Sequence, residues 1–163
     1  MIELADRHGW FRSVFAGAPI LVPVPGSGCS GNGSWPAAHL AVTLKEFGLA
    51  RAMSVALRRQ FAIRKSSQAS AGMRPTVEEH YRSFVGSAGS ADRPEKVILI
   101  DDVITKGRTL FAAAARLRTI LPHTEVRGFA LLRTMGHLER LDRLIAPCEG
   151  VVYWAAGDVR REP

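Results

Sequence analysis

Strands alternate with helices along the second half of this 163-residue chain. An aliphatic run at 96–100 predicts a buried strand, and the alanine-rich segment 109–121 predicts a helix. A strand over 125–134, an amphipathic helix over 136–145 and a last strand over 150–154 follow. Because parallel strands need crossover connections, this alternation predicts an α/β fold with a parallel sheet and helices on both of its faces.

The first half of the chain contains elements of the same kind. The segment PILVPVP at 19–25 predicts a strand, with prolines confined to its ends or to an edge. Residues 35–47 have the pattern of a helix, and 54–59 predict a short strand. We therefore expect a single domain over 1–163.

A long polar segment lies between these halves. Residues 64–75 lack periodicity and predict a flexible loop, which in a small domain often has a function. The next segment, 76–84, predicts a short helix, since Thr76 and Glu79 have the spacing of a capping box.

Composition limits the class of protein. The formal net charge is +7, which favours anionic partners such as phosphates and nucleotides, and nucleic acid is a further possible partner; a solvated basic surface explains the charge equally well. No apolar run approaches the ~18 residues of a membrane span, and the first residues do not resemble a signal peptide. Cys29 and Cys148 lack metal-ligand spacing, so we expect no metal bound by cysteine and a cytoplasmic protein.

Two adjacent acids follow the aliphatic run in VILIDDVITKGRT, residues 97–109. Ligands of open parallel sheets bind at the carboxyl ends of the strands, where we expect Asp101 and Asp102. Carboxylates bind phosphate poorly but accept hydrogen bonds from a vicinal diol, such as the hydroxyls of a ribose.

The loop after the acids has the composition of a phosphate site. Backbone N–H groups gather at the start of the next helix, Gly107 permits close approach, and Lys106 and Arg108 add positive charge. Thr105 and Thr109 offer hydroxyls. Acids and loop together predict a ribose 5-phosphate site; the alternative is that the acids cap a turn and the loop only connects two elements.

The thirteen residues 97–109 resemble the phosphoribosyl-pyrophosphate (PRPP) motif of type I phosphoribosyltransferases. This resemblance implies a Rossmann-like fold with a central parallel β-sheet flanked by helices, a flexible catalytic loop and a hood over the base. It implies an enzyme that transfers the phosphoribosyl group of PRPP to a nucleobase or other nitrogen acceptor and releases pyrophosphate. Asp101 and Asp102 would hold the ribose hydroxyls. The 5-phosphate would be held by Thr105, Lys106, Gly107, Arg108 and Thr109.

The resemblance also implies partners and a metal. Magnesium would enter bound to the phosphates of PRPP, since Mg²⁺ keeps several waters and binds through substrate phosphates. Dimers are common in this family, which implies a homodimer. Thr105 stands where hypoxanthine–guanine enzymes typically have an aspartate, which favours another acceptor.

A longer resemblance, over residues 20–134, is to ComF-type phosphoribosyltransferase-like proteins. Both begin with a PVP strand and continue to the PRPP motif. The chain departs from that branch at 26–35, where GSGCSGNGSW replaces a basic segment, and it lacks an N-terminal zinc-binding cysteine module. The alternative function that follows from this branch is a non-catalytic protein that senses PRPP or nucleotides, or handles DNA.

The resemblance implies two further parts of the site. A pyrophosphate loop would follow the first strand and bind through backbone amides; a glycine-rich linker without a ligand is the alternative. Its residues would be Pro25, Gly26, Ser27 and Gly28.

The flexible loop 64–75 would bring a cation to the pyrophosphate. Arg64 and Lys65 are the predicted catalytic cations, with Arg74 as a third candidate, and a solvated loop is the alternative.

Four aromatic or imidazole side chains receive no catalytic role from the sequence. His39 and His80 fall within predicted helices, where a surface or packing role is expected. Tyr153 and Trp154 end the last strand, and core packing is favoured there over stacking on a base.

Overall fold

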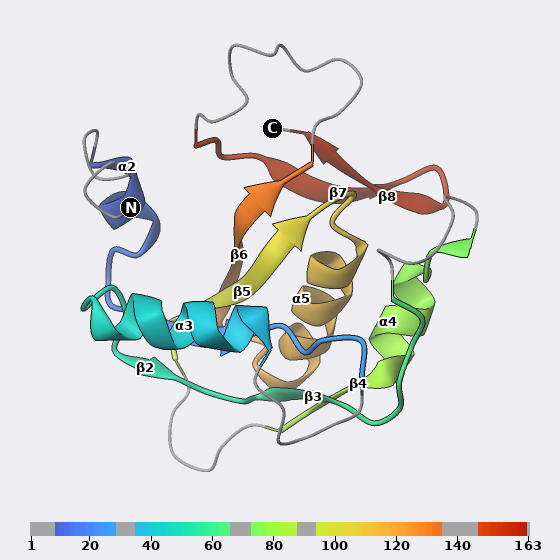
Figure 1. Ribbon diagram of the computed structural model, residues 1–163, viewed down its shortest axis with the longest axis horizontal. Coiled ribbons are helices and arrows are strands. Elements are labelled where there is room, and N and C mark those ends of the chain that lie inside the picture. The colour runs from blue at the N-terminus through green and yellow to red at the C-terminus, as the bar shows by residue number, and fades with distance from the viewer. Residues whose placement is uncertain (1–8, 29–34, 66–72, 88–93, 135–146, 163) are drawn as a thin grey trace.

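The computed structural model of the protein describes residues 9–28, 35–65, 73–87, 94–134 and 147–162. A central sheet runs through it, with helices beside the sheet and a hairpin above its end (Figure 1). Within the described residues no helix is long and apolar enough to cross a membrane.

The central sheet has four strands, and every neighbouring pair is parallel. Its strands are β1 (Ile20–Pro23), β2 (Ala52–Met53), β5 (Lys96–Ile104) and β6 (Glu125–Arg133). They lie in the order β2-β1-β5-β6. The mixed α/β class and the parallel central sheet are confirmed, and the arrangement is compatible with a Rossmann-like fold.

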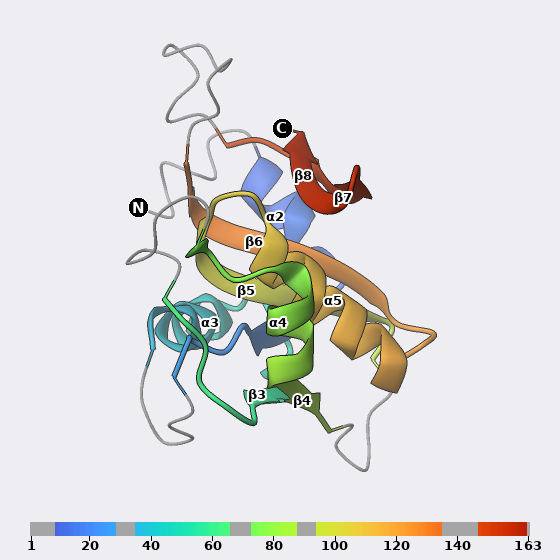
Figure 2. The same ribbon diagram turned by 90° about the vertical axis from the view of Figure 1, so that its right-hand side faces the viewer.

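Helices cover both faces of this sheet. In Figure 2, α3 (Pro36–Glu46) lies on one side of β5, while α5 (Arg108–Ile120) and α4 (Val77–Ser83) lie on the other. A short helix, α2 (Trp10–Val14), which the sequence did not predict, joins the face of α3. The helices predicted at 35–47, 76–84 and 109–121 are confirmed to within about two residues.

The alternation of side chains along β5 explains why both faces are covered. Val97 and Leu99 belong to the core cluster beneath α5, whereas Ile98 and Ile100 belong to the cluster beneath α3. All four are buried. A strand that is apolar on both faces is stable only between two layers of other elements.

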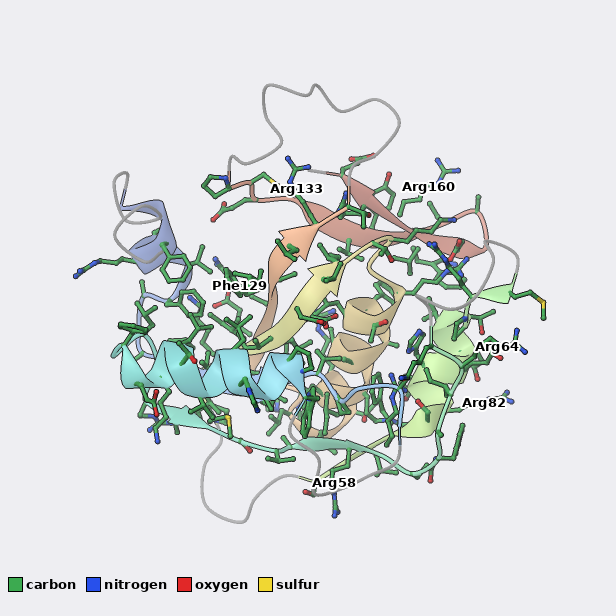
Figure 3. The ribbon with its side chains drawn as sticks, in the orientation of Figure 1. Arg58, Arg64, Arg82, Phe129, Arg133 and Arg160 are labelled. Carbon is green, nitrogen blue, oxygen red and sulfur yellow. The ribbon has the colours of Figure 1, made fainter. Side chains whose placement is uncertain are left out.

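Aromatic rings attach α2 to the sheet. Phe129 on β6 packs edge-on against Phe11 and Phe15, with ring centroids 5.7 and 5.2 Å apart (Figure 3). The ammonium of Lys96 donates hydrogen bonds to the carbonyls of Val14 and Ala16, at 3.1 Å each. Strand β6 thus contributes an apolar anchor for α2, and β5 contributes a polar one.

Two small antiparallel pairs lie outside the central sheet. β3 (Leu57–Arg59) pairs with β4 (Phe84–Gly86), and β7 (Val151–Ala155) pairs with β8 (Asp158–Glu162). The strand predicted at 54–59 therefore forms only over its second half.

The place expected for the last strand was wrong, because β7 belongs to a hairpin and not to the parallel sheet. The turn residues Ala156 and Gly157 have φ values of 50° and 80°. Positive φ at both central residues is typical of the tight turns that join antiparallel strands. The helix predicted at 136–145 lies outside the described residues.

Candidate functional site

The two acids lie on β5 where its two neighbours end at different points. Pairing with β1 stops at Pro23 and Ile100, whereas pairing with β6 continues to Ile104. The expectation that the acids end the strand was therefore wrong: β6 extends the strand past them. On the β1 side, however, the pairing ends at Ile100, directly before Asp101 and Asp102.

Asp101 is the more perturbed of the two acids. It is half-buried, and its Oδ1 accepts a hydrogen bond from the backbone N–H of Asp102 at 3.0 Å. Burial, followed by the hydrogen bond and charge of the Asp102 side chain, raises the pKa of Asp101 to about 7. Near neutral pH its carboxyl group can therefore both donate to and accept from a hydroxyl.

The loop 105–109 turns sharply before α5. Gly107 is the residue before the helix and has a φ of 87°, and its carbonyl accepts from the N–H of Phe111 at 2.8 Å. The N–H groups of the first helical turn have no carbonyl partner within the helix. A cavity of about 90 Å³ lies between this loop, β5 and the start of α4. Its lining includes Asp101 and the whole loop: Thr105, Lys106, Gly107, Arg108 and Thr109.

The two basic residues of the loop are held by an acid from the C-terminal hairpin. Asp158 accepts from Nε and Nη2 of Arg108, at 2.7 and 2.5 Å, and lies 3.3 Å from Nζ of Lys106. The third donor group of Arg108, Nη1, contacts the carbonyl of Pro75 at 3.3 Å. The hydrogen bonds from Arg108, and to a smaller extent the one from Lys106, hold the pKa of Asp158 well below its usual range. The role of both cations as phosphate ligands stays a prediction.

The predicted pyrophosphate loop lies at a second cavity. Pro25, Gly26 and Gly28 line a cavity of about 350 Å³ together with Trp35 and strand β3. The carbonyl of Ser27 accepts from the N–H of Ile63 at 2.9 Å. The two predicted loops thus border different cavities.

A buried polar chain joins these loops. Arg59 on β3 donates from Nε to the carbonyl of Gly26 at 2.5 Å, and its Nη2 lies 3.2 Å from Nδ1 of His80. The other ring nitrogen of His80 lies 3.4 Å from Oγ1 of Thr109. His80 is buried as a packing residue would be, yet it also lines the cavity and contacts Thr109 of the loop 105–109.

The predicted catalytic cations Arg64 and Lys65 do not line the cavity of the loop 105–109. Arg64 and Lys65 are exposed, and Arg64 donates to the carbonyl of Met73 at 3.1 Å. Figure 3 shows Arg64 pointing outward beside α4. Arg74 does line the cavity. Residues 66–72, the centre of the predicted flexible loop, lie outside the described residues.

The aromatic residues of the hairpin are not in the core. Trp154 is 54% exposed, so the expectation of core packing was wrong for it. Its ring lies 6.2 Å from that of Phe111 on α5. Tyr153 is half-buried and donates from its hydroxyl to Glu162 on β8. Trp154 is wrongly predicted because β7 is a hairpin strand with one open face.

Sequence reasoning missed three residues of this region: Arg59, His80 as a contact of Thr109, and Asp158. The partners of Arg59 lie 33, 24 and 21 positions away, and Asp158 lies 50 positions from Arg108. Contacts over such separations leave no signal in a short stretch of sequence.

The donor set does not form a protein cage for a metal. Among the described residues no group of three or more histidine, cysteine, aspartate or glutamate side chains is placed to hold an ion. A magnesium ion that enters with the phosphates of its ligand needs no such group, and its binding stays a prediction. Comparison of the chain with protein-family models, with curated protein sequences and with solved structures found no match.

Proposed function

We propose that this protein is a phosphoribosyltransferase, which binds PRPP with magnesium and transfers its phosphoribosyl group to a nitrogen acceptor. One observation carries the proposal: Asp101 and the entire loop 105–109 line one cavity. Acceptors for a diol and donors for a phosphate are therefore close together, as a ribose 5-phosphate requires. The motif 97–109 supports the same ligand.

The proposed reaction is a nucleophilic displacement at C1, the anomeric carbon of the ribose. The bond from C1 to the pyrophosphate oxygen breaks and its electron pair leaves with pyrophosphate. The acceptor nitrogen forms the new bond to C1 and gives up its proton to solvent. Magnesium, when bound, would offset the charge of the pyrophosphate. The task of Asp101 and Asp102 is to orient the ribose through its hydroxyls, and that of the loop is to hold the 5-phosphate.

Calorimetric titration with PRPP and magnesium tests the proposal. We expect saturable binding to the wild-type protein and none to the double variant Asp101→Asn/Asp102→Asn. Glu125→Gln is a matched control, because Glu125 is an exposed acid whose partner is Arg127 on the same strand. Binding that survives in the double variant contradicts the proposed site.

Transfer itself needs a second measurement. Pyrophosphate release is followed with PRPP, magnesium and a panel of nucleobases and other nitrogen acceptors. Release that depends on one acceptor identifies the substrate, and release that is equal with and without acceptors contradicts transfer.

A second candidate function is PRPP binding without transfer, as in a sensor. The observation that favours it is the position of Arg64 and Lys65, which are exposed and do not line the cavity. A sensor would bind PRPP and release no pyrophosphate with any acceptor. If its partner were nucleic acid, that binding would weaken steeply with salt and change with PRPP.

A further inference from the structure

A buried arginine faces the interior of the protein beside the pyrophosphate loop. Arg59 is 8% exposed, and its guanidinium lies 4.2 Å from the ring centroid of Phe84. Besides its bond to the carbonyl of Gly26, it donates from Nη1 to Oγ of Ser83. A planar guanidinium that has a separate partner for each of its three nitrogens has a fixed orientation.

His80 continues this contact to the phosphate loop. It is 3% exposed, and burial, followed by the positive charge of Arg59, lowers its pKa to about 4. The ring is therefore neutral at physiological pH. Because arginine is always a donor, Nδ1 of His80 must accept, and Nε2 carries the proton directed at Oγ1 of Thr109.

The polar connection from Gly26 to Thr109 thus consists of two side chains, those of Arg59 and His80. One end fixes the carbonyl of a residue in the predicted pyrophosphate loop, and the other end contacts the last residue of the predicted phosphate loop. The two loops follow neighbouring strands, β1 and β5, and border different cavities. A rigid polar connection therefore helps to set the distance between them.

We propose that Arg59 and His80 are positioning residues that hold the two loops at the separation required by a pentose phosphorylated at both ends. The inference rests on the proposed function and extends it to ligand selection. A ligand such as PRPP must contact both loops at once, and it gains affinity when their spacing is fixed beforehand. Ribose 5-phosphate contacts the phosphate loop and the acids, and does not depend on the spacing.

Two substitutions at His80 each remove one of its two contacts and keep the other. Asparagine can keep an oxygen near the Nδ1 position for Arg59 and lose the contact to Thr109. Glutamine can keep a donor near the Nε2 position for Thr109 and lose the contact to Arg59. Arg59→Lys keeps the charge and loses the planar set of donors. Arg82→Lys is the matched control, because Arg82 is an exposed arginine on α4 that pairs with Glu78 and lines neither cavity (Figure 3).

The experiment is a calorimetric titration of each variant with PRPP and magnesium and, separately, with ribose 5-phosphate. We expect His80→Asn and His80→Gln to weaken PRPP binding by about tenfold, the equivalent of one hydrogen bond. Because His80 also lines the cavity of the loop 105–109, ribose 5-phosphate binding should weaken too, but by less. Arg59→Lys should act in the same direction. Arg82→Lys should change neither.

The outcomes separate the two proposals. If the wild type binds neither ligand, the proposed function fails. If the wild type binds both and the folded variants lose affinity for both equally, the residues are merely structural and the inference is overturned. A thermal melt of each variant shows that it is folded; if Arg59→Lys is not, the two His80 variants decide the question.

Discussion

The carboxylate of Asp158 accepts two hydrogen bonds from the guanidinium of Arg108, at 2.7 Å from Nε and 2.5 Å from Nη2. This bidentate pair joins the C-terminal hairpin to the loop 105–109. Val152 on the same hairpin packs against Gly107. The hairpin thus contacts the predicted phosphate loop through an ion pair and through an apolar side chain, and each contact has a separate consequence.

Substitution of Asp158 should strengthen phosphate binding while it weakens the fold. Asp158→Asn removes a negative charge that lies within 3.3 Å of both Lys106 and Arg108, so both cations become available to a phosphate. We expect ribose 5-phosphate to bind several-fold more tightly, by calorimetry. The free energy of unfolding should fall by about 1 kcal/mol, since the pair is partly exposed and screened by solvent.

The control for this variant lies on the same hairpin. Glu162→Gln removes the charge of a carboxylate that accepts a hydrogen bond from the hydroxyl of Tyr153. It should change ribose 5-phosphate affinity little. Weaker phosphate binding in Asp158→Asn would mean that the ion pair positions the loop and does not compete with the ligand.

Gly107 should tolerate no side chain. Its φ is 87°, and an added Cβ would lie 2.8 Å from Cγ1 of Val152. We expect Gly107→Ala to lower the free energy of unfolding in urea by about 2 kcal/mol, from backbone strain and from the clash together.

A second substitution separates these two causes. Val152→Ala in the Gly107→Ala background removes the clash and leaves the strain, so part of the loss should return. Gly26→Ala, whose Cβ would meet its nearest neighbour only at 4.0 Å, is the control and should cost less. Equal costs at Gly107 and Gly26 would show that the hairpin does not press on the loop.

The capping box predicted at the start of α4 is confirmed. The N–H of Thr76 donates to Oε2 of Glu79 at 2.6 Å, and Oγ1 of Thr76 accepts from the N–H of Glu79 at 3.2 Å. Thr76→Ala should lower the free energy of unfolding by about 1 kcal/mol. Thr119→Ala on α5 is the control, because an exposed helical threonine gains helix propensity when replaced by alanine. If the free energy of unfolding falls by the same amount in both variants, the cap does not stabilise α4.

How much the sequence predicts depends on how far apart the contacting residues are. The strands β1 and β6, the helices α3 and α5, and the loop 105–109 follow from patterns of a few consecutive residues. The capping box spans four positions and was also found. The closeness of Asp101 to the loop was expected for the same reason, since both belong to one strand–loop–helix unit. The wall that the start of α4 adds to their cavity was not expected.

Contacts between distant segments account for what the sequence did not predict. The bond between Arg59 and His80 depends on β3 pairing with β4 and on α4 ending at β4, 21 positions along the chain. Asp158 reaches Arg108 because the hairpin folds back over the loop. The extension of β5 past its acids follows from the length of β6. None of these relations leaves a local pattern.

Two buried titratable groups act on stability in opposite directions. His80 has a pKa of about 4 in the folded protein, against an ordinary value of 6.5, so between these pH values the unfolded chain binds more protons. Stability therefore falls as the pH is lowered from about 6.5 to 4. Asp101 has a pKa of about 7 against an ordinary value of 3.8, so the folded protein binds more protons between them. Its contribution falls as the pH is raised through that window.

Because the two effects oppose each other, we expect the wild-type protein to show a shallow pH dependence between about pH 4 and 7. Asp101→Asn removes one of them. In this variant the free energy of unfolding in urea should fall as the pH is lowered from 6.5 towards 4, by up to about 3 kcal/mol from the shift at His80. Glu125→Gln, which changes an exposed acid, should leave the shallow profile unchanged. If Asp101→Asn and the wild-type protein follow the same curve, Asp101 titrates as an ordinary exposed carboxyl group, and its assigned place in the buried edge of the site is wrong.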